Sequence, residues 1–191
     1  MGVSLGAVST FFQFRRARTI SVDGISLTTW YQFVVMSGFW ISYGLAIREP
    51  VIVAGSLVVL PMQVSIVARL RPWDHRTIVR SSAFMVVCCV APTVLFGWTA
   101  GVLGTGVAMV ANRFPQIITL VRHPGDFGVS AGSWMVGAIC SAMWISYYAG
   151  ARLWAAMAAT AAAMLGNIAI SVLAYWRHRE AEILQLDVAT I

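Results

Sequence analysis

The chain of 191 residues is 59% hydrophobic and only 10% charged, and its mean hydropathy is +0.79. A soluble globular domain does not need so apolar a composition, so the sequence predicts an integral membrane protein that crosses the bilayer several times. The formal net charge of +6 rests on thirteen arginines and no lysine, which lie mostly in short stretches between apolar segments. This distribution is typical of membrane topology and argues against a nucleic-acid-binding surface.

Seven apolar segments follow one another along the chain, and an all-α membrane protein with seven transmembrane helices is expected. About 20 residues of helix are needed to cross a hydrocarbon core of roughly 30 Å. The first segment ends before Arg15 and covers only about 21 Å. Either the true start lies upstream of Met1, which we favour, or this helix is short and draws its end into the membrane. The segments are Met1–Phe14, Ser26–Leu45, Pro50–Ala68, Ser81–Trp98, Gly101–Val121, Ser130–Gly150 and Leu153–Trp176.

The connecting segments alternate in their arginine content. Ten arginines follow the first, third, fifth and seventh apolar segments, whereas the second and sixth are followed only by Arg48 and Arg152. Cytoplasmic loops of membrane proteins carry an excess of basic residues. The sequence therefore predicts a multi-pass protein of the cell inner (plasma) membrane, with its N-terminus outside and its C-terminus in the cytoplasm.

The two halves of the chain form an internal repeat with an offset of 104 residues. Eight positions are identical within a stretch of twenty. We therefore expect a first three-helix repeat (1–70), a linker helix (71–100), a second repeat (101–176) and a cytoplasmic tail (177–191). Because the linker helix restores the starting orientation, the repeats are parallel in a 3+1+3 arrangement. The identical residues are Gly24, Ser26, Trp30, Ser37, Trp40, Ile41, Ser42 and Tyr43, matched by Gly128, Ser130, Trp134, Ser141, Trp144, Ile145, Ser146 and Tyr147.

Several motifs lie at defined places in this layout. Pro115-Gln116 stands near the cytoplasmic end of the fifth segment, Gly128-Val129-Ser130 follows the next loop, and Trp-Ile-Ser-Tyr begins at both Trp40 and Trp144. The chain resembles the SWEET and SemiSWEET sugar transporters of the PQ-loop superfamily over nearly its whole length. The resemblance implies facilitated diffusion (uniport) of a small mono- or disaccharide by alternating access of two three-helix bundles.

The resemblance also implies a substrate site. In the family a tryptophan near the end of the second helix and an asparagine sixteen residues later hold the sugar. Trp40 and Trp144 match the tryptophan, while Ser56 and Thr160 stand where the family has asparagine. Aromatic rings can stack on a sugar and hydroxyl groups can bind its hydroxyls, so these four residues are the expected substrate-binding set.

A second polar pair, Gln63 and Asn167, lies seven residues further along each third helix. Seven residues are about two helical turns, so each amide shares a helix face with Ser56 or Thr160, roughly 10 Å away. Amide groups in a bilayer face protein or water. Two interpretations remain open, namely hydrogen bonding between packed helices and lining of the translocation path.

Gate and hinge residues are expected at both ends of the spans. Pro115 removes a helical hydrogen bond and predicts a hinge next to Gln116, whereas the matching position in the first repeat, Phe12 before Gln13, has no proline. The resemblance implies an extracellular gate that includes Tyr43, Tyr147, Arg48 and Glu49. An ion pair between Arg152 and Glu49 across the two halves is left open, since exposed loop charges are often simply solvated.

Arg113 is the one charged residue well inside a predicted span. Such residues are functional candidates, but snorkelling of the guanidinium to the cytoplasmic interface is the simpler interpretation. All seven carboxylates and the three histidines, His75, His123 and His178, fall in loops or tail. A proton-coupled carrier uses titratable groups within its spans, so uniport without proton coupling is expected.

No nucleophile–base or metal-ligand spacing is present, and Cys88, Cys89 and Cys140 lie in apolar segments. The sequence therefore predicts neither an enzyme nor a cofactor or metal. Expected partners are a small-molecule solute and the lipid bilayer, with homo-oligomerisation left open. The alternative function is a proton-coupled transporter of amino acids or other small solutes from the PQ-loop superfamily. A receptor or assembly partner on the same fold is a third class.

Overall fold

The computed structural model describes residues 2–70, 73–122 and 129–189, with side chains described from residue 6 to residue 180 within these ranges. The described residues are predominantly helical and contain no β-strand. Of the residues discussed above, His123 and Gly128 lie outside them, as does the carboxylate of Asp126. An all-α protein is therefore confirmed.

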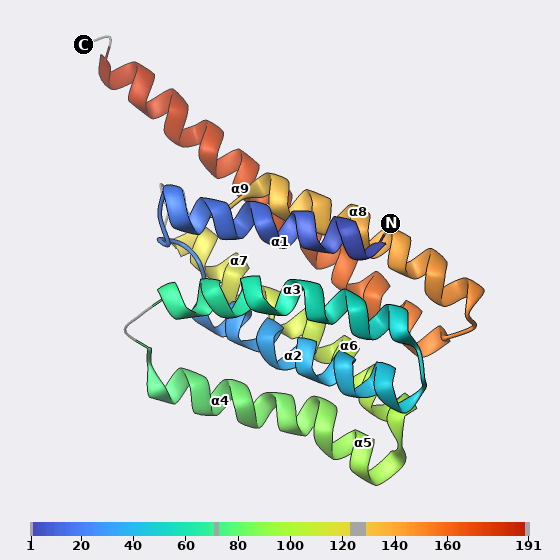
Figure 1. Ribbon diagram of the computed structural model, residues 1–191. Coiled ribbons are helices and arrows are strands. Elements are labelled where there is room, and N and C mark those ends of the chain that lie inside the picture. Colours follow the sequence, from blue (N-terminus) through green and yellow to red (C-terminus); the bar gives the residue numbers. More distant parts are fainter. Residues whose placement is uncertain (1, 71–72, 123–128, 190–191) are drawn as a thin grey trace.

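Seven helical rods follow one another in the described chain, and consecutive rods run in opposite directions (Figure 1). The first and fifth rods consequently start at the same end, as two parallel repeats require. The rods are α1 (Gly2–Thr19), α2 (Leu27–Ala46), α3 (Pro50–Arg69), a composite of α4 (His75–Met85), the π-helical η1 (Val86–Val90) and α5 (Ala91–Phe96), a pair formed by α6 (Trp98–Ala111) and α7 (Arg113–Arg122), α8 (Ala131–Gly150), and α9 (Trp154–Ala189).

Three stretches of the described chain are long and apolar enough to cross a membrane, namely Pro50–Arg69, His75–Phe96 and Trp154–Glu180. The other rods fall short for visible reasons. Helices α2 and α8 are rich in Trp, Tyr and Ser, α1 carries three arginines in its last turns, and Asn112 interrupts the rod formed by α6 and α7. A membrane protein with three membrane-capable helices is therefore supported, while the seven spans stay a prediction.

The outer surface is apolar in a way that suits lipid. Large hydrophobic side chains are exposed along the rods, among them Val94 and Phe96 on α5 and Leu165 and Trp176 on α9. So much exposed apolar side-chain surface is unusual for a soluble monomer. It lies on the outside of the bundle, while many polar side chains are buried between the helices.

The boundaries of three rods differ from those expected. Helix α1 continues past Arg15 to Thr19, because arginine is a good helix former and nothing in Arg15–Thr19 breaks a helix. Helix α9 continues beyond Trp176 to Ala189, so the segment assigned to a tail extends the last helix. The fifth rod is interrupted at Asn112, three residues before Pro115, whereas α1, which lacks the proline, is continuous.

Matching local structures recur in the two repeats. Ser26 caps α2 by accepting a hydrogen bond from the Thr29 backbone N–H (3.3 Å), and Ser130 caps α8 in the same way through Ser133 (3.1 Å). Arg48 and Arg152 both have positive φ angles, 58° and 56°, in the turns that lead into α3 and α9. These equivalences support the internal repeat at the level of the backbone.

The composite fourth rod packs against α2 and α6. Pro92 has no N–H, so the Cys88 carbonyl cannot receive the usual helical hydrogen bond from residue 92. This carbonyl faces α6, where a Cβ added to Gly104 would lie 1.7 Å from it. The π-helical turn at Val86–Val90 thus coincides with a proline and a close helix approach, two common causes of helix irregularity.

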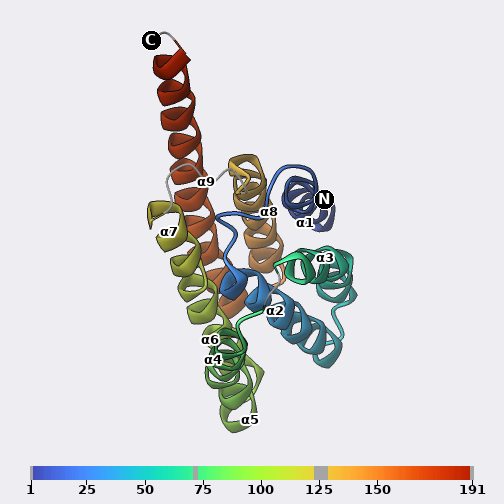
Figure 2. The ribbon, with the colours of Figure 1, turned by 90° about the vertical axis from the view of Figure 1, so that its left-hand side faces the viewer.

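The two repeats interlock. Helix α1 packs against α3 of its own repeat and against α8 of the other, and α7 packs against α9 and also contacts α2. Figure 2 shows α1 beside α8, with α2 lying between α3 and the rod formed by α6 and α7. The second helix of each repeat therefore faces the first helix of the other, and both repeats border the centre of the bundle.

Candidate functional site

A cavity of about 250 Å³ lies between the two repeats. Residues of α1, α2, α3, α6, α7, α8 and α9 line it, and the linker rod contributes none of the described lining residues. Its wall combines aromatic rings with small hydroxyl and amide groups. Such a mixed lining is typical of sites for small polar molecules.

The four expected substrate-binding residues all line this one cavity. Trp40 and Trp144 face Tyr148, whose ring is stacked against both, with centroid distances of 6.3 and 5.5 Å and interplanar angles of 16° and 27°. The Thr160 hydroxyl donates to the Ala156 carbonyl of its own helix (2.8 Å), which leaves its oxygen able to accept. Ser56 is half-buried. The convergence expected from the repeat is therefore present, and Tyr148 is an additional central residue.

Gln63 and Asn167 also line the cavity, and each joins two helices of its own repeat. The Ser37 hydroxyl donates to Gln63 Oε1 (2.7 Å), and Asn167 Nδ2 donates to the equivalent Ser141 hydroxyl (3.4 Å). The two interpretations drawn from the sequence are thus compatible in this geometry. Each amide links the second and third helices while its side chain borders the cavity.

Arg113 does not snorkel, and that interpretation is wrong. The side chain is only 5% exposed and lines the cavity. Its Nε and Nη2 donate to Asn167 Oδ1 (3.2 and 3.0 Å), and its Nη1 donates to Asn112 Oδ1 (2.7 Å) and to the Met109 carbonyl. The guanidinium also lies 5.4 Å from the ring centroid of Phe33. These acceptors hold it inside the protein, so it does not extend toward the interface.

Gly166 makes room for Arg113, which gives a stability prediction. A Cβ at position 166 would lie 2.7 Å from Arg113 Cδ, so Gly166→Ala is expected to lower the unfolding free energy by about 1 kcal/mol, since overpacking outweighs the gain in helix propensity. Thermal unfolding in detergent measures this. The matched control is Gly38→Ala, where the new methyl meets nothing within 4 Å. The effect should disappear when Arg113 is first replaced by alanine, and equal stability of Gly166→Ala and Gly38→Ala would contradict the packing argument.

Hydrogen bonds connect the two repeats at the end of the bundle where α2 and α8 begin. The Ser130 backbone N–H donates to Gln13 Oε1 (3.0 Å), and the Ser26 N–H donates to Gln116 Oε1 (3.1 Å). Gln116 Nε2 also donates to the Gly24 carbonyl (2.6 Å). Each glutamine thus binds the N-terminus of the second helix of the other repeat. Pro115 lies next to Gln116 in α7 and outside the cavity.

Matching hydroxyl contacts reinforce this end. The Thr29 hydroxyl donates to the Asn112 carbonyl (2.7 Å), and the equivalent Ser133 hydroxyl donates to the Ser9 carbonyl (2.6 Å). The Asn112 contact falls at the break between α6 and α7. Buried backbone carbonyls need hydrogen-bond donors. If the repeats separated at this end, the carbonyls of Asn112 and Ser9 would therefore need new donors.

The opposite end carries a different contact between the repeats. The Tyr147 hydroxyl donates to Glu49 Oε2 (2.8 Å), and Tyr43 packs against Trp40 with ring centroids 5.7 Å apart. No ion pair between Arg152 and Glu49 occurs among the described residues. Arg48 follows Ile47 in the turn between α2 and α3 and does not line the cavity. Both ends of the cavity are therefore bridged, by glutamines at one and by a tyrosine–carboxylate contact at the other.

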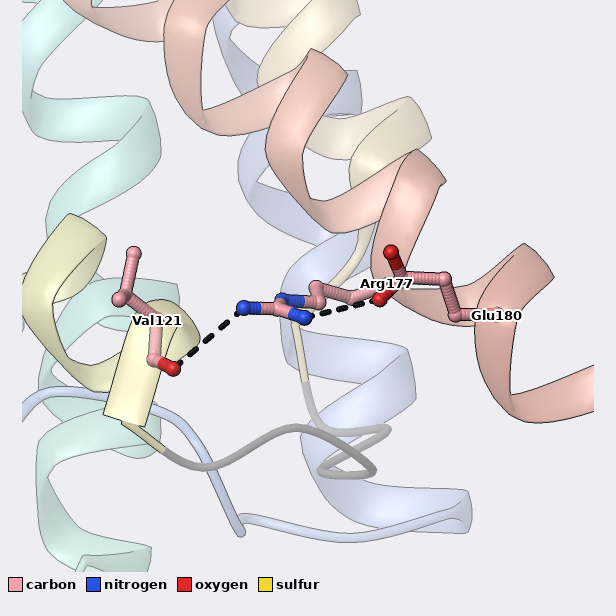
Figure 3. Close-up of polar contacts among 3 residues, drawn as sticks. All are labelled: Val121, Arg177 and Glu180. Carbon is pink, nitrogen blue, oxygen red and sulfur yellow. Dashed lines mark hydrogen bonds and ion pairs between the residues drawn. The ribbon is translucent and has the colours of Figure 1, made fainter. Parts of the chain in front are cut away.

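Charged contacts outside the cavity are few in the described part of the chain. Arg177 Nη1 pairs with Glu180 Oε2 (2.8 Å) and Arg177 Nη2 donates to the Val121 carbonyl (3.5 Å), so α9 is tied to the end of α7 (Figure 3). At the start of α4, the Thr77 hydroxyl and the Arg76 and Thr77 backbone N–H groups lower the pKa of Asp74. Both contacts stabilise helix ends and lie away from the cavity.

Within the described residues, no group of three His, Cys, Asp or Glu side chains is placed to hold a metal ion. Cys88, Cys89 and Cys140 form no disulfide. The cavity wall itself contains no described Asp, Glu or His, so Arg113 provides its formal charge.

No protein-family model, no curated protein and no solved structure matches the chain.

Proposed function

We propose that this protein is a membrane transporter that carries a small polar solute, a sugar or a close relative of one, by alternating access. The observation that supports this most is the cavity between the repeats, whose walls include the equivalent residues Trp40 and Trp144. A cavity of about 250 Å³ is slightly smaller than the roughly 300–1,000 Å³ usual for small-molecule sites, which suits a small solute. The resemblance to the SWEET and SemiSWEET transporters agrees with this reading.

The contacts at the two ends of the cavity suggest how the solute would move. Alternating access requires two arrangements in which opposite ends open. Loss of the Gln13 and Gln116 hydrogen bonds would open one end, and loss of the contact between Tyr147 and Glu49 would open the other. The irregularity at Asn112, where α6 ends and α7 begins, is the proposed hinge between these two helices.

The proposed topology has seven crossings of the inner membrane in a 3+1+3 arrangement, with the N-terminus outside and the C-terminus in the cytoplasm. The arginine distribution supports this orientation. A fluorescent reporter fused after Arg179 should therefore be bright, and a phosphatase fused there should be inactive. Phosphatase activity at this position would contradict the orientation.

Transport is proposed to be uniport. The cavity wall offers no described carboxylate or imidazole that could take up and release a proton during the cycle. In proteoliposomes, a pH gradient without a solute gradient should therefore produce no accumulation of a transported solute. Accumulation driven by that gradient would favour the alternative, a proton-coupled carrier of amino acids or other small solutes.

One observation favours that alternative in part. Arg113 could bind the carboxylate of an amino acid, since guanidinium groups bind carboxylates well. An amino acid also carries an ammonium group, and the described wall offers no carboxylate to receive it. The sugar-type solute is therefore kept as the first candidate.

A further inference from the structure

Arg113 brings a positive charge into the cavity, and no described residue of the cavity wall carries a negative charge to balance it. All of its hydrogen-bond acceptors are neutral, namely the side-chain oxygens of Asn167 and Asn112 and the Met109 carbonyl. The guanidinium remains protonated at physiological pH. A buried cation is unfavourable unless an anion or strong acceptors compensate it.

The described carboxylates are engaged elsewhere. Glu49 accepts from Tyr147, Asp74 caps α4 and Glu180 pairs with Arg177. Asp23 accepts from Ser21 in the segment before α2. The carboxylates of Asp126, Glu182 and Asp187 lie outside the described side chains. Within the described part of the chain, therefore, no carboxylate borders the cavity or contacts Arg113.

The side-chain amide of Asn112, beside Arg113, has a donor without an acceptor. Asn112 is only 1% exposed, and its oxygen accepts from Arg113 while its Nδ2 has no hydrogen-bond partner. Buried amide groups are nearly always paired. Beside the guanidinium, therefore, one further buried donor is left without an acceptor among the described residues.

The fit around Arg113 is specific to one repeat. In the first helices Gln13 corresponds to Gln116, one residue short of the offset of 104, so Thr10 corresponds to Arg113 there. At the offset of 104, Met62 corresponds to Gly166. Only glycine at 166 leaves room for the arginine stem. Phe33, which lies against the guanidinium, corresponds to Gly137 in the other repeat. The arginine, the space that Gly166 leaves and the ring of Phe33 therefore occur together. The equivalent positions of the other repeat lack this combination.

We propose that the transported solute carries a carboxylate, which Arg113 binds inside the cavity while the uncharged part of the solute lies near the two tryptophans. This rests on the proposed transport function and narrows its substrate to acidic sugars and related small hydroxy acids. The Nε–Nη2 edge of the guanidinium, which now donates to Asn167 Oδ1, presents two donors in the geometry that suits a carboxylate. Asn167 Oδ1 orients this edge until the carboxylate oxygens of the solute take its place as acceptors.

The test compares pairs of solutes that share a carbon skeleton and differ at one functional group, which is charged in one member and neutral in the other. Uptake into proteoliposomes is measured for glucuronate against glucose, galacturonate against galactose and glycerate against glycerol, each pair differing by a carboxylate in place of a CH₂OH group. The wild-type protein should carry the acid of at least one pair about tenfold or more faster than the neutral member. Arg113→Gln should abolish this preference, as expected when a charge-assisted hydrogen bond is removed.

Two further variants keep the test decisive. Arg113→Lys retains the charge and should retain part of the preference for the acid, and Arg177→Gln, outside the cavity, should leave the preference unchanged. An unchanged acid preference in inserted Arg113→Gln protein, or uptake of only neutral members by the wild type, would overturn the carboxylate proposal and leave transport intact. Uptake of no member of any pair by the wild type would count against the proposed function as well.

Discussion

Replacement of Trp144 by alanine is expected to reduce solute uptake by about tenfold or more. The ring lines the cavity and stacks on Tyr148, so its removal takes away one aromatic wall and loosens a second. An aromatic contact is worth roughly 1 kcal/mol beyond its buried area, and about 1.4 kcal/mol corresponds to a factor of ten. Initial uptake rates in proteoliposomes, normalised to inserted protein, give the measurement.

The matched control is Trp176→Ala. Trp176 lies on α9, is 65% exposed and does not line the cavity, so this variant removes the same side chain without touching the site. It should transport like the wild type. Equal uptake by the Trp144→Ala and Trp176→Ala variants, at equal membrane insertion, would refute the assignment of the cavity as the substrate site.

Alanine at both Gln13 and Gln116 is expected to open one end of the cavity. Each substitution leaves a backbone N–H of the other repeat, buried at Ser26 and partly buried at Ser130, without its acceptor, which costs about 1–3 kcal/mol. The closed arrangement of this end should lose about tenfold or more in population. Cys140 lines the cavity, so its rate of labelling by a small membrane-impermeant maleimide reports the opening.

The labelling experiment needs a background with Cys88 and Cys89 replaced by alanine, so that Cys140 is the only thiol. Gln32→Ala is the control, because Gln32 is equally buried on α2 but its Oε1 has no hydrogen-bond partner to lose. It should leave the labelling rate unchanged. No increase in the double variant above this control would show that the glutamines do not hold the end closed.

The repeat predicted the parts of the site in which the two halves are alike. Identical or equivalent residues such as Trp40 and Trp144 had to converge if the halves are related by an axis between them, and they line one cavity. Site residues at positions where the two halves differ cannot be found in this way. Tyr148, which stacks on both tryptophans, corresponds to Gly44, where a Cβ would lie 2.8 Å from Val53 Cγ2. The central ring was therefore missed.

Arg113 was misread for a related reason. Its position near the inner end of a predicted span made snorkelling plausible, because the sequence does not show which helices surround it. The acceptor Asn167 and the aromatic Phe33 come from α9 and α2. A usable signal did exist, since glycine at 166 and arginine at 113 both depart from the first repeat. Compensating changes of size at two positions suggest contact, even in a single sequence.

The accuracy of the predicted helix boundaries was limited by local energetics. Arginines mark the end of the first apolar segment, but a helix can continue through them into the interface, as α1 does to Thr19. In the fifth rod, Pro115 predicted an irregularity, which the structure places at Asn112 because the missing N–H affects the preceding turn. The number of rods followed from the apolar pattern, whereas their ends depended on such details.

The most direct test of alternating access is the labelling of Cys140 from each side of the membrane. In the single-thiol protein, the proposed mechanism predicts that an impermeant maleimide added to the medium labels Cys140 in both kinds of vesicle. It acts from the extracellular side in right-side-out vesicles and from the cytoplasmic side in inverted ones. A transported solute should slow labelling from both sides. Labelling from one side only, in the wild type and in the Gln13 and Gln116 double variant alike, would contradict transport by alternating access.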